Sequence, residues 1–316
     1  NLMKKILGII FSSLLYFNLS LADNSIEIKK FDKKNIEVLK FKVPDRKFPG
    51  KDDVIAQIHF PKKFDSKSLI IHQHGSSRDG MKFKKWGGKT DEWGTRLIKA
   101  ALKRGYAVAV IDAFYERRLK PNDKTKFPNA VNIGLRLGEI LSKDKRFDKS
   151  KIFYTGFSYG AGWILELQGE YYSKQKIFKA VVAAEPGCNA NSIPTKNNFS
   201  TLIIKGEESH YYPIACESYL TMIKKVNNKV EYISIPKADH SFSSNRKTGS
   251  GKAFNGCSNN IILIYPDGIW KHMDGTLTSR KEAMTKCMTN ESGGSSTREK
   301  LNEAITIALN YIDKNS

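Results

Sequence analysis

The chain has 316 residues and a formal net charge of +21, with 53 lysines and arginines against 32 acidic residues. Hydrophobic residues make up 40% and aromatic residues 11%, which is enough to bury a sizeable core and excludes a disordered or low-complexity chain. The length allows one large α/β domain or two small ones. Lysine, asparagine and isoleucine are abundant together, as an AT-rich genome would encode in any protein. We therefore interpret the charge as composition bias, and no motif indicates a nucleic-acid partner.

The first 22 residues have the pattern of a signal peptide. Lys4 and Lys5 form a positive start, residues 6–17 are almost wholly apolar, and residues 20–22 offer small side chains at the cleavage positions. The apolar run is short for a membrane span, and no cysteine lies beside the cleavage site to carry a lipid. We therefore expect an exported protein, periplasmic or secreted, with no stable membrane anchor once residues 1–22 are removed.

The remaining residues, 23–316, are interpreted as a single α/β domain. Segments 36–43 and 53–60 alternate in a strand-like way and predict an antiparallel flank. From residue 68 onward, short β-branched runs alternate with helical patterns, which is typical of a parallel sheet built from βαβ units. The predicted strands are 68–72, 106–111, 151–155, 180–184, 201–205 and 230–235, and the predicted helices are 91–104, 129–141, 160–171, 213–226 and 297–313. Residues 243–296 are polar and are predicted to form a long ordered insertion.

Residues 156–160 (GFSYG) match the pattern G-x-S-x-G. They directly follow the predicted strand 151–155 and directly precede a predicted helix, the context in which this pattern forms a sharp turn that exposes the serine. The glycines leave room where the backbone is crowded, and the start of the helix favours developing negative charge. Ser158 is therefore the predicted nucleophile.

A serine nucleophile needs a base, and in this arrangement the base follows the nucleophile and an acid along the chain. His240 follows the predicted strand 230–235, where a loop would reach back over Ser158. His210 competes by position, but it lies where the acid is expected. We predict that His240 is the base.

The negative charge that develops on a substrate carbonyl oxygen needs preorganised hydrogen-bond donors. We expect the backbone N–H of Tyr159, directly after the nucleophile, and the N–H of Ser76, in the loop after the strand 68–72. His72 and His74 precede that loop in an HxH pattern. Because no third ligand lies nearby, the pattern does not predict a metal site.

The acid is not settled by the sequence. The segment GEESH follows the predicted strand 201–205, where the acid usually lies, but Ser209 occupies the position that is usually Asp. The candidates are Glu208, one residue earlier with a longer side chain, and Glu185, at the end of an earlier strand. An acid at the end of that earlier strand reaches the same histidine in some hydrolases. We favour Glu185 over Glu208, with Glu207 below both, and leave the choice open.

With these residues placed, the sequence resembles the exported branch of the dienelactone hydrolase family of α/β-hydrolases. The motifs that carry the resemblance are HGSS at 74–77, GYAVAVIDAF at 105–114, GFSYG at 156–160, EPGC at 185–188, GEESHYYPIAC at 206–216 and KADHSF at 237–242. The resemblance implies the α/β-hydrolase fold, with a mostly parallel central sheet of about eight strands flanked by helices. It also implies hydrolysis of an ester or lactone without a cofactor.

Ser158 and His240 match the family's nucleophile and base positions. Founding members use cysteine as the nucleophile, so Ser158 argues for chemistry like that of a carboxylesterase. Ser209 and Glu185 depart from the family pattern, because relatives have the acid at the first position and often an aromatic residue at the second. A carboxylate has therefore appeared near the site as another was lost, which supports Glu185.

The four cysteines are widely spaced and include no CxxC pair, so disulfides in an oxidising compartment are favoured over zinc. The spacing alone leaves three connectivities open. Relatives carry cysteines like Cys188 and Cys216, so the resemblance implies a bond between these two. Cys257 and Cys287 would then tie the insertion.

The predicted enzyme would act on a small-molecule ester or lactone, with no nucleic-acid partner. Two other functions stay open: a catalytically weakened binding protein of the same fold, and a basic protein that binds a polyanion or an anionic envelope. The insertion 243–296 could act as a lid. Aromatic residues that could line an acyl pocket are Trp86, Trp93, Tyr159, His210, Tyr211 and Tyr212.

Overall fold

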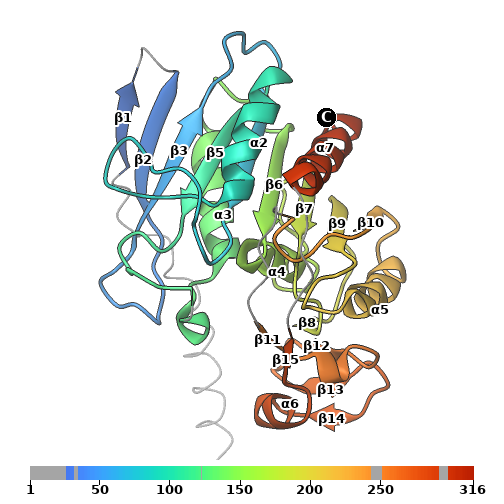
Figure 1. Ribbon diagram of the computed structural model, residues 1–316. Coiled ribbons are helices and arrows are strands. Elements are labelled where there is room, and N and C mark those ends of the chain that lie inside the picture. The colour runs from blue at the N-terminus through green and yellow to red at the C-terminus, as the bar shows by residue number, and fades with distance from the viewer. Residues whose placement is uncertain (1–25, 32–34, 122, 243–250, 292–297) are drawn as a thin grey trace, which may run out of the picture.

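The computed structural model describes residues 26–31, 35–121, 123–242, 251–291 and 298–316 (Figure 1). The predicted signal peptide, residues 1–22, lies outside these ranges. Within them, no helix is both long enough and apolar enough to cross a membrane.

A nine-stranded sheet forms the centre of the molecule, with the strand order β1-β2-β3-β5-β4-β6-β7-β9-β10 (Figure 1). These strands are β1 (Glu27–Phe31), β2 (Ile36–Lys42), β3 (Asp53–His59), β4 (Leu69–Gln73), β5 (Ala107–Asp112), β6 (Ile152–Phe157), β7 (Ala180–Ala184), β9 (Ser200–Gly206) and β10 (Val230–Ile235). The strands β1 to β3 run antiparallel to their neighbours, and β5, β4, β6, β7, β9 and β10 run parallel to one another. The expected mostly parallel sheet is confirmed, but it has one strand more than the eight expected. The additional strand is β1, a largely exposed edge strand in which charged residues outnumber apolar ones.

Helices cover both faces of this sheet and bury two separate apolar clusters. The helices are α2 (Glu92–Lys103), α3 (Ala130–Ser142), α4 (Tyr159–Glu166), α5 (Pro213–Lys224) and α7 (Arg298–Lys314). Apolar side chains of α3, α4 and α5 pack on one face, and those of α2 and α7 pack on the other. Helix α2 begins where predicted because the side chain of Asp91 accepts a hydrogen bond from Gly94 N at 2.7 Å, which satisfies a free N–H of the first turn.

Helix α4 is five residues shorter than its predicted end at residue 171. The residues just after its end meet another segment of the chain: Thr195 N donates to Gln168 O at 2.8 Å, and Gly169 forms a bridge with Pro194. These contacts use backbone groups that a longer helix would need. Tertiary contacts have therefore ended the helix early.

The described part of the predicted insertion, residues 251–291, folds into small elements at one end of the main sheet (Figure 1). They are β11 (Gly251–Ala253), η3 (Asn255–Cys257), β12 (Ile262–Ile264), β13 (Trp270–His272), β14 (Leu277–Thr278), α6 (Arg280–Lys286) and β15 (Thr289–Glu291). Strand β12 pairs in parallel with β8 (Ala190–Ser192), which follows β7, so the insertion continues a small sheet that begins in the main chain. The segments 243–250 and 292–296 lie outside the described residues.

Candidate active site

The GFSYG segment forms a tight corner between β6 and α4. Ser158 has φ 50° and ψ −108°, a backbone conformation that is strained for a residue with a side chain. A Cβ at Gly156 would lie 2.6 Å from the backbone of Gly160, and a Cβ at Gly160 would lie 2.4 Å from Gln73 O. Only glycine allows strand, corner and helix to approach so closely. The corner holds Ser158 at the carboxyl end of β6.

His240 and Glu185 complete a chain of hydrogen bonds that begins at Ser158. The Oγ atom of Ser158 lies 2.8 Å from Nε2 of His240, and Nδ1 of the same ring lies 3.0 Å from Oε2 of Glu185. Glu185 directly follows β7, and His240 lies in the loop after β10. Because these strands are parallel, their carboxyl ends share one edge of the sheet, where three segments far apart in sequence meet. Serine, imidazole and carboxylate in this order are the arrangement of a nucleophile, a base and the group that orients the base.

The carboxylate of Glu185 is completely buried and has several hydrogen-bond donors. Lys205 Nζ and Ser209 Oγ each donate to Oε2 at 2.7 Å, and Gly206 N donates to Oε1. Burial alone would raise the pKa of Glu185, but the ammonium of Lys205 and the hydrogen bond with His240 lower it to about 2. The carboxylate of Glu185 is therefore ionised at neutral pH.

The structure separates the candidate acids clearly. Glu185 reaches His240, whereas Glu207 and Glu208 are exposed, because the chain turns outward after β9. Ser209, at the position where the acid was expected, points its hydroxyl at Glu185. Lys205 is absent from the predicted site residues, since a lysine at the end of an apolar strand normally reaches solvent. The only signal was its place within the buried run TLIIK.

The two expected oxyanion donors belong to the start of α4 and to the loop after β4, where a Cβ at Gly75 would lie 3.4 Å from the Cβ of Ser158. The N–H of Tyr159 is the first of α4 and has no acceptor within the helix. The loop after β4 is held by a hydrogen bond from Gly75 N to the carboxylate of Asp91, which leaves the N–H of Ser76 as the next donor along the loop. The ring of His74 packs 5.8 Å from that of Tyr159 and so holds this loop beside the start of α4.

The two histidines of the HxH pattern have separate structural partners. His72 bonds Asp91 and Thr155, each at 3.0 Å, and His74 lies 2.7 Å from Gly75 O and 3.1 Å from Ala113 N. Burial lowers the pKa of His74 to about 4, so its ring is neutral. Across the described ranges, no three His, Cys, Asp or Glu side chains are placed to hold a metal ion.

Aromatic rings surround His240. The rings of His210, Tyr211 and Phe157 lie 4.6, 5.0 and 5.7 Å from the imidazole of His240. Burial, helped by the nearby His240, lowers the pKa of His210 to about 3, so this ring is neutral. Of the other aromatic candidates, Trp93 is buried against Phe157. Trp86 lies against Lys40, whose Nζ is 5.4 Å from the centre of its ring.

The insertion is fastened to the loop that carries His210. The side chain of Asn255, which is buried, accepts from Tyr212 N at 3.1 Å and donates to His210 O at 2.8 Å. A disulfide joins Cys188, three residues after Glu185, to Cys216 in the first turn of α5. The second disulfide joins Cys257 to Cys287 within the insertion. These are the pairs that the resemblance implies.

A groove of about 350 Å³ lies beside Tyr159, the residue after the nucleophile. It starts at Tyr159 and Gly187 and continues past Gly162, Trp163, Glu166, Ala190, Asn191 and Ile264. Ile264 belongs to β12, so the insertion supplies one wall. Burial raises the pKa of Glu166, and its carboxyl group is bound by the hydroxyl of Ser192. Tyr159, Trp163, Ala190 and Ile264 make most of the groove surface apolar.

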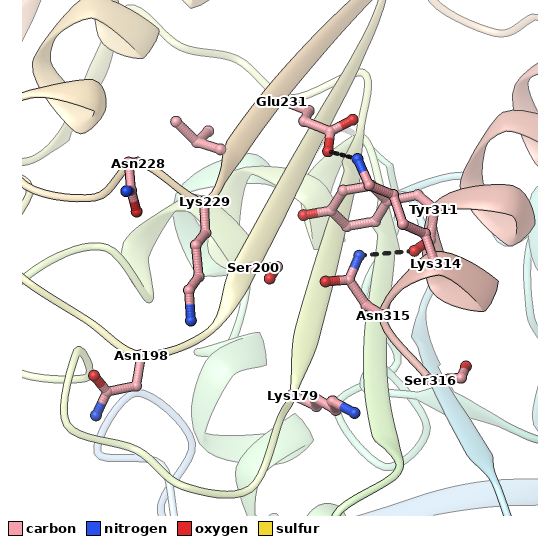
Figure 2. A pocket seen from close by; sticks show the side chains of 11 residues that line it. Lys179, Asn198, Ser200, Asn228, Lys229, Glu231, Tyr311, Lys314, Asn315 and Ser316 are labelled. Carbon is pink, nitrogen blue, oxygen red and sulfur yellow. Dashed lines mark hydrogen bonds and ion pairs between the residues drawn. The ribbon is translucent and has the colours of Figure 1, made fainter.

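A larger hollow, of about 480 Å³, lies at the opposite edge of the sheet (Figure 2). Lys179, Ser200 and Val230 line it at the amino ends of β7, β9 and β10, whereas the Ser158 site lies at the carboxyl ends. Figure 2 shows Lys314 of α7 paired with Glu231, a contact of 2.7 Å. This hollow contains no nucleophile paired with a base, so we do not assign the chemistry to it.

Comparisons with known proteins test the fold. No protein-family model matches the chain, and a search of curated proteins found no match either. Among solved structures, a candidate dipeptidyl aminopeptidase IV from Bacteroides ovatus superposes with a TM-score of 0.53 at 13% identity. The match covers 90% of this chain but only 36% of that one. A candidate dienelactone hydrolase from Klebsiella pneumoniae superposes with a TM-score of 0.51 at 15% identity, over 92% of this chain and 100% of that one. Identities this low establish the shared architecture alone: the chain has the α/β-hydrolase fold.

Proposed function

We propose that the protein is a serine hydrolase that cleaves an ester or lactone through an acyl-enzyme on Ser158. The observation that supports this function best is the unbroken series of contacts from Ser158 Oγ through His240 to the ionised Glu185. A serine hydroxyl is a weak nucleophile until a base within hydrogen-bond distance takes its proton. Nε2 of His240 lies 2.8 Å from Ser158 Oγ, and Nδ1 of the same ring lies 3.0 Å from the carboxylate of Glu185.

In the proposed mechanism, His240 takes the proton of Ser158 as Oγ attacks the substrate carbonyl. Glu185 stabilises the imidazolium that results, without itself taking the proton. The N–H groups of Tyr159 and Ser76 bind the oxyanion. His240 then gives its proton to the leaving alcohol, and a water activated in the same way releases the acid from Ser158.

We propose that the groove from Tyr159 to Ile264 binds one side of the substrate. Its walls are mainly apolar, and its start lies beside the residue that donates to the oxyanion. An uncharged acyl or alcohol group would gain most from burial there. The substrate is thus proposed to be a small uncharged ester or lactone rather than a nucleic acid.

Export to a periplasmic or extracellular compartment, without a membrane anchor after signal cleavage, belongs to the same proposal. Two disulfides are compatible with an oxidising compartment, because reducing conditions in the cytosol disfavour them. Expressing the full chain in bacteria and locating it by cell fractionation tests this step. Recovery of the uncleaved chain from the cytosol would contradict it.

The nucleophile can be tested without knowing the substrate. A fluorophosphonate probe should label the protein, and mass spectrometry should place the added mass on Ser158. Labelling should vanish in Ser158→Ala and persist in Ser150→Ala, a matched change at the opposite end of β6. Turnover of nitrophenyl acetate should follow the same pattern.

An unlabelled Ser158 together with no ester turnover would contradict the proposed function. The remaining functions would then be those of a binding protein of the same fold or a basic protein that binds polyanions. Retention on heparin that weakens steeply with salt and does not depend on Ser158 would identify the second.

A further inference from the structure

A buried lysine contacts the carboxylate that orients the base. Lys205 lies near the end of β9, next to β7 in the sheet, and neither its side chain nor that of Glu185 is exposed to solvent. Its Nζ atom donates to Glu185 Oε2 at 2.7 Å, to Ser209 Oγ at 3.1 Å and to Pro186 O at 3.2 Å. The three donors of the ammonium group are therefore all used within a few ångströms of the triad.

A positive charge at this position has no explanation in packing alone. The three residues before Lys205, Leu202 to Ile204, are apolar and buried, and an apolar side chain of similar length would continue their pattern. A buried ammonium group costs desolvation energy and persists only beside an opposite charge. Glu185 is the carboxylate that bonds it.

We propose that Lys205 is a positioning residue of the active site, which holds Glu185 ionised and fixes its Oε2 atom toward His240. The inference rests on the proposed function and deepens it. A glutamate has one more rotatable bond than the aspartate usual at such sites, so its carboxylate needs anchoring. Gly206 N anchors Oε1, while Lys205 and the hydroxyl of Ser209 anchor Oε2.

Lys205 also affects the imidazole. Oε2 of Glu185 accepts from Lys205 Nζ at 2.7 Å and lies 3.0 Å from Nδ1 of His240, so one oxygen joins the ammonium group to the ring. The other titratable or charged groups around His240 are His210 and Tyr211 in the loop after β9, Asp239 next to it in the chain, and Lys124 at the hydroxyl of Tyr211. None of these groups is altered in the variants used below.

The test is the rate at which a fluorophosphonate probe labels Ser158, measured from pH 5 to pH 9. Lys205→Met should slow labelling by at least about tenfold at neutral pH. It should also move the acidic limb of the profile upward, because the site loses a positive charge next to its carboxylate. Lys179→Met, at the amino end of β7, is the matched control and should leave both quantities unchanged.

A double-mutant cycle with Glu185→Gln separates positioning from a purely structural role. If Lys205 acts through Glu185, adding Lys205→Met to Glu185→Gln should change the rate by less than about threefold. An equal loss in both backgrounds, or an acidic limb that does not move, would overturn the proposal. If Lys205→Met fails to fold while the double variant folds, the unpaired carboxylate is the cause, which supports the proposal. Failure of both variants to fold would overturn it.

This design also separates the two proposals. Wild-type protein that shows no labelling of Ser158 would remove the proposed function itself. Wild-type protein that is labelled at Ser158, together with an unaffected Lys205→Met variant, would remove only the role of Lys205.

Discussion

The hydroxyl of Ser209 donates a hydrogen bond to Glu185 at 2.7 Å, on the same oxygen that faces Nδ1 of His240. Ser209 stands where an acid was expected from the resemblance, and Glu185 comes from the neighbouring strand. Ser209, in the loop after β9, therefore contacts the carboxylate, which Glu185 supplies instead. The two positions are close enough for one to support the other, and their roles can be tested separately.

The first prediction concerns the identity of the acid. Glu185→Gln should lower kcat/KM for nitrophenyl acetate by about 10²- to 10⁴-fold, because the amide cannot stabilise the imidazolium and favours the wrong tautomer. Glu208→Gln, which changes an exposed side chain in the loop after β9, should stay within about twofold of wild type. A reversed order of the two effects would assign the acid to Glu208.

The second prediction is that the acid can be moved back to its expected position. In Glu185→Gln, adding Ser209→Asp should recover at least about tenfold of the lost kcat/KM. Ser209 already bonds Lys205 and Glu185, so a carboxylate at position 209 would lie among the same buried groups. It would pair with Lys205. Ser209→Asn in the same background is the control for size and should recover nothing. Equal rates for the Asp and Asn variants would show that residue 209 cannot reach His240.

Much of this fold could be predicted because its strands are short apolar runs between turns. The strands β7 and β10 have the bounds that their sequences indicate. The strand β1 was not predicted. It is exposed and pairs with β2 alone through its backbone, so its side chains need not be apolar. The parallel pair β8–β12 joins two three-residue segments about 70 residues apart, which no local pattern can indicate.

The site divides in the same way. Ser158 and His240 follow from the corner motif and the chain order, which are local signals. The choice of Glu185 over Glu208 depends on which side chain turns inward after neighbouring strands, and this is a property of the folded sheet. The proposed role of Lys205 depends on its complete burial, which is rare for a lysine and therefore is not expected from the sequence.

The third prediction follows from the lowered pKa of Glu185. The pKa is about 2 in the folded protein against an ordinary value of 4.5, so the folded state binds a proton at this site less readily than the unfolded state. The resulting stability is fully present above pH 4.5 and is lost as the pH falls from 4.5 toward 2. It amounts to about 3 kcal/mol at most.

Denaturant unfolding of wild type and Glu185→Gln at several pH values between 7 and 2 measures this contribution. The variant should lose less stability than wild type between pH 4.5 and 2, and Glu208→Gln should keep the wild-type slope. Identical slopes in wild type and Glu185→Gln would mean that the carboxylate titrates alike in the folded and unfolded states.

The fourth prediction concerns the disulfide beside the triad. The bond between Cys188 and Cys216 closes a loop of 28 residues, which in the chain-entropy description stabilises the fold by about 3 to 4 kcal/mol. Replacing both cysteines by serine should lower the free energy of unfolding by about that amount. A non-reducing peptide map of wild type should show the pairs 188–216 and 257–287, and any other pairing would contradict the structure.

The fifth prediction concerns the wall that the insertion gives to the groove. Ile264→Trp should narrow the groove and lower kcat/KM for esters with a large acyl or alcohol group by at least about tenfold, while acetate esters of small alcohols stay within about twofold. Ile264→Ala should shift the preference toward larger groups. Leu277→Ala, at a side chain of the same insertion that is 67% exposed, is the matched control.

Two series of substrates show which part of the ester the groove holds. Nitrophenyl esters of increasing acyl length vary one side, and acetate esters of increasing alcohol size vary the other. A response in one series assigns that side to the groove, because Ile264 can discriminate only among groups that reach β12. Equal changes for every ester in both series would mean that the groove is not the substrate site, and that residues 251–291 support the His210 loop without contacting the substrate.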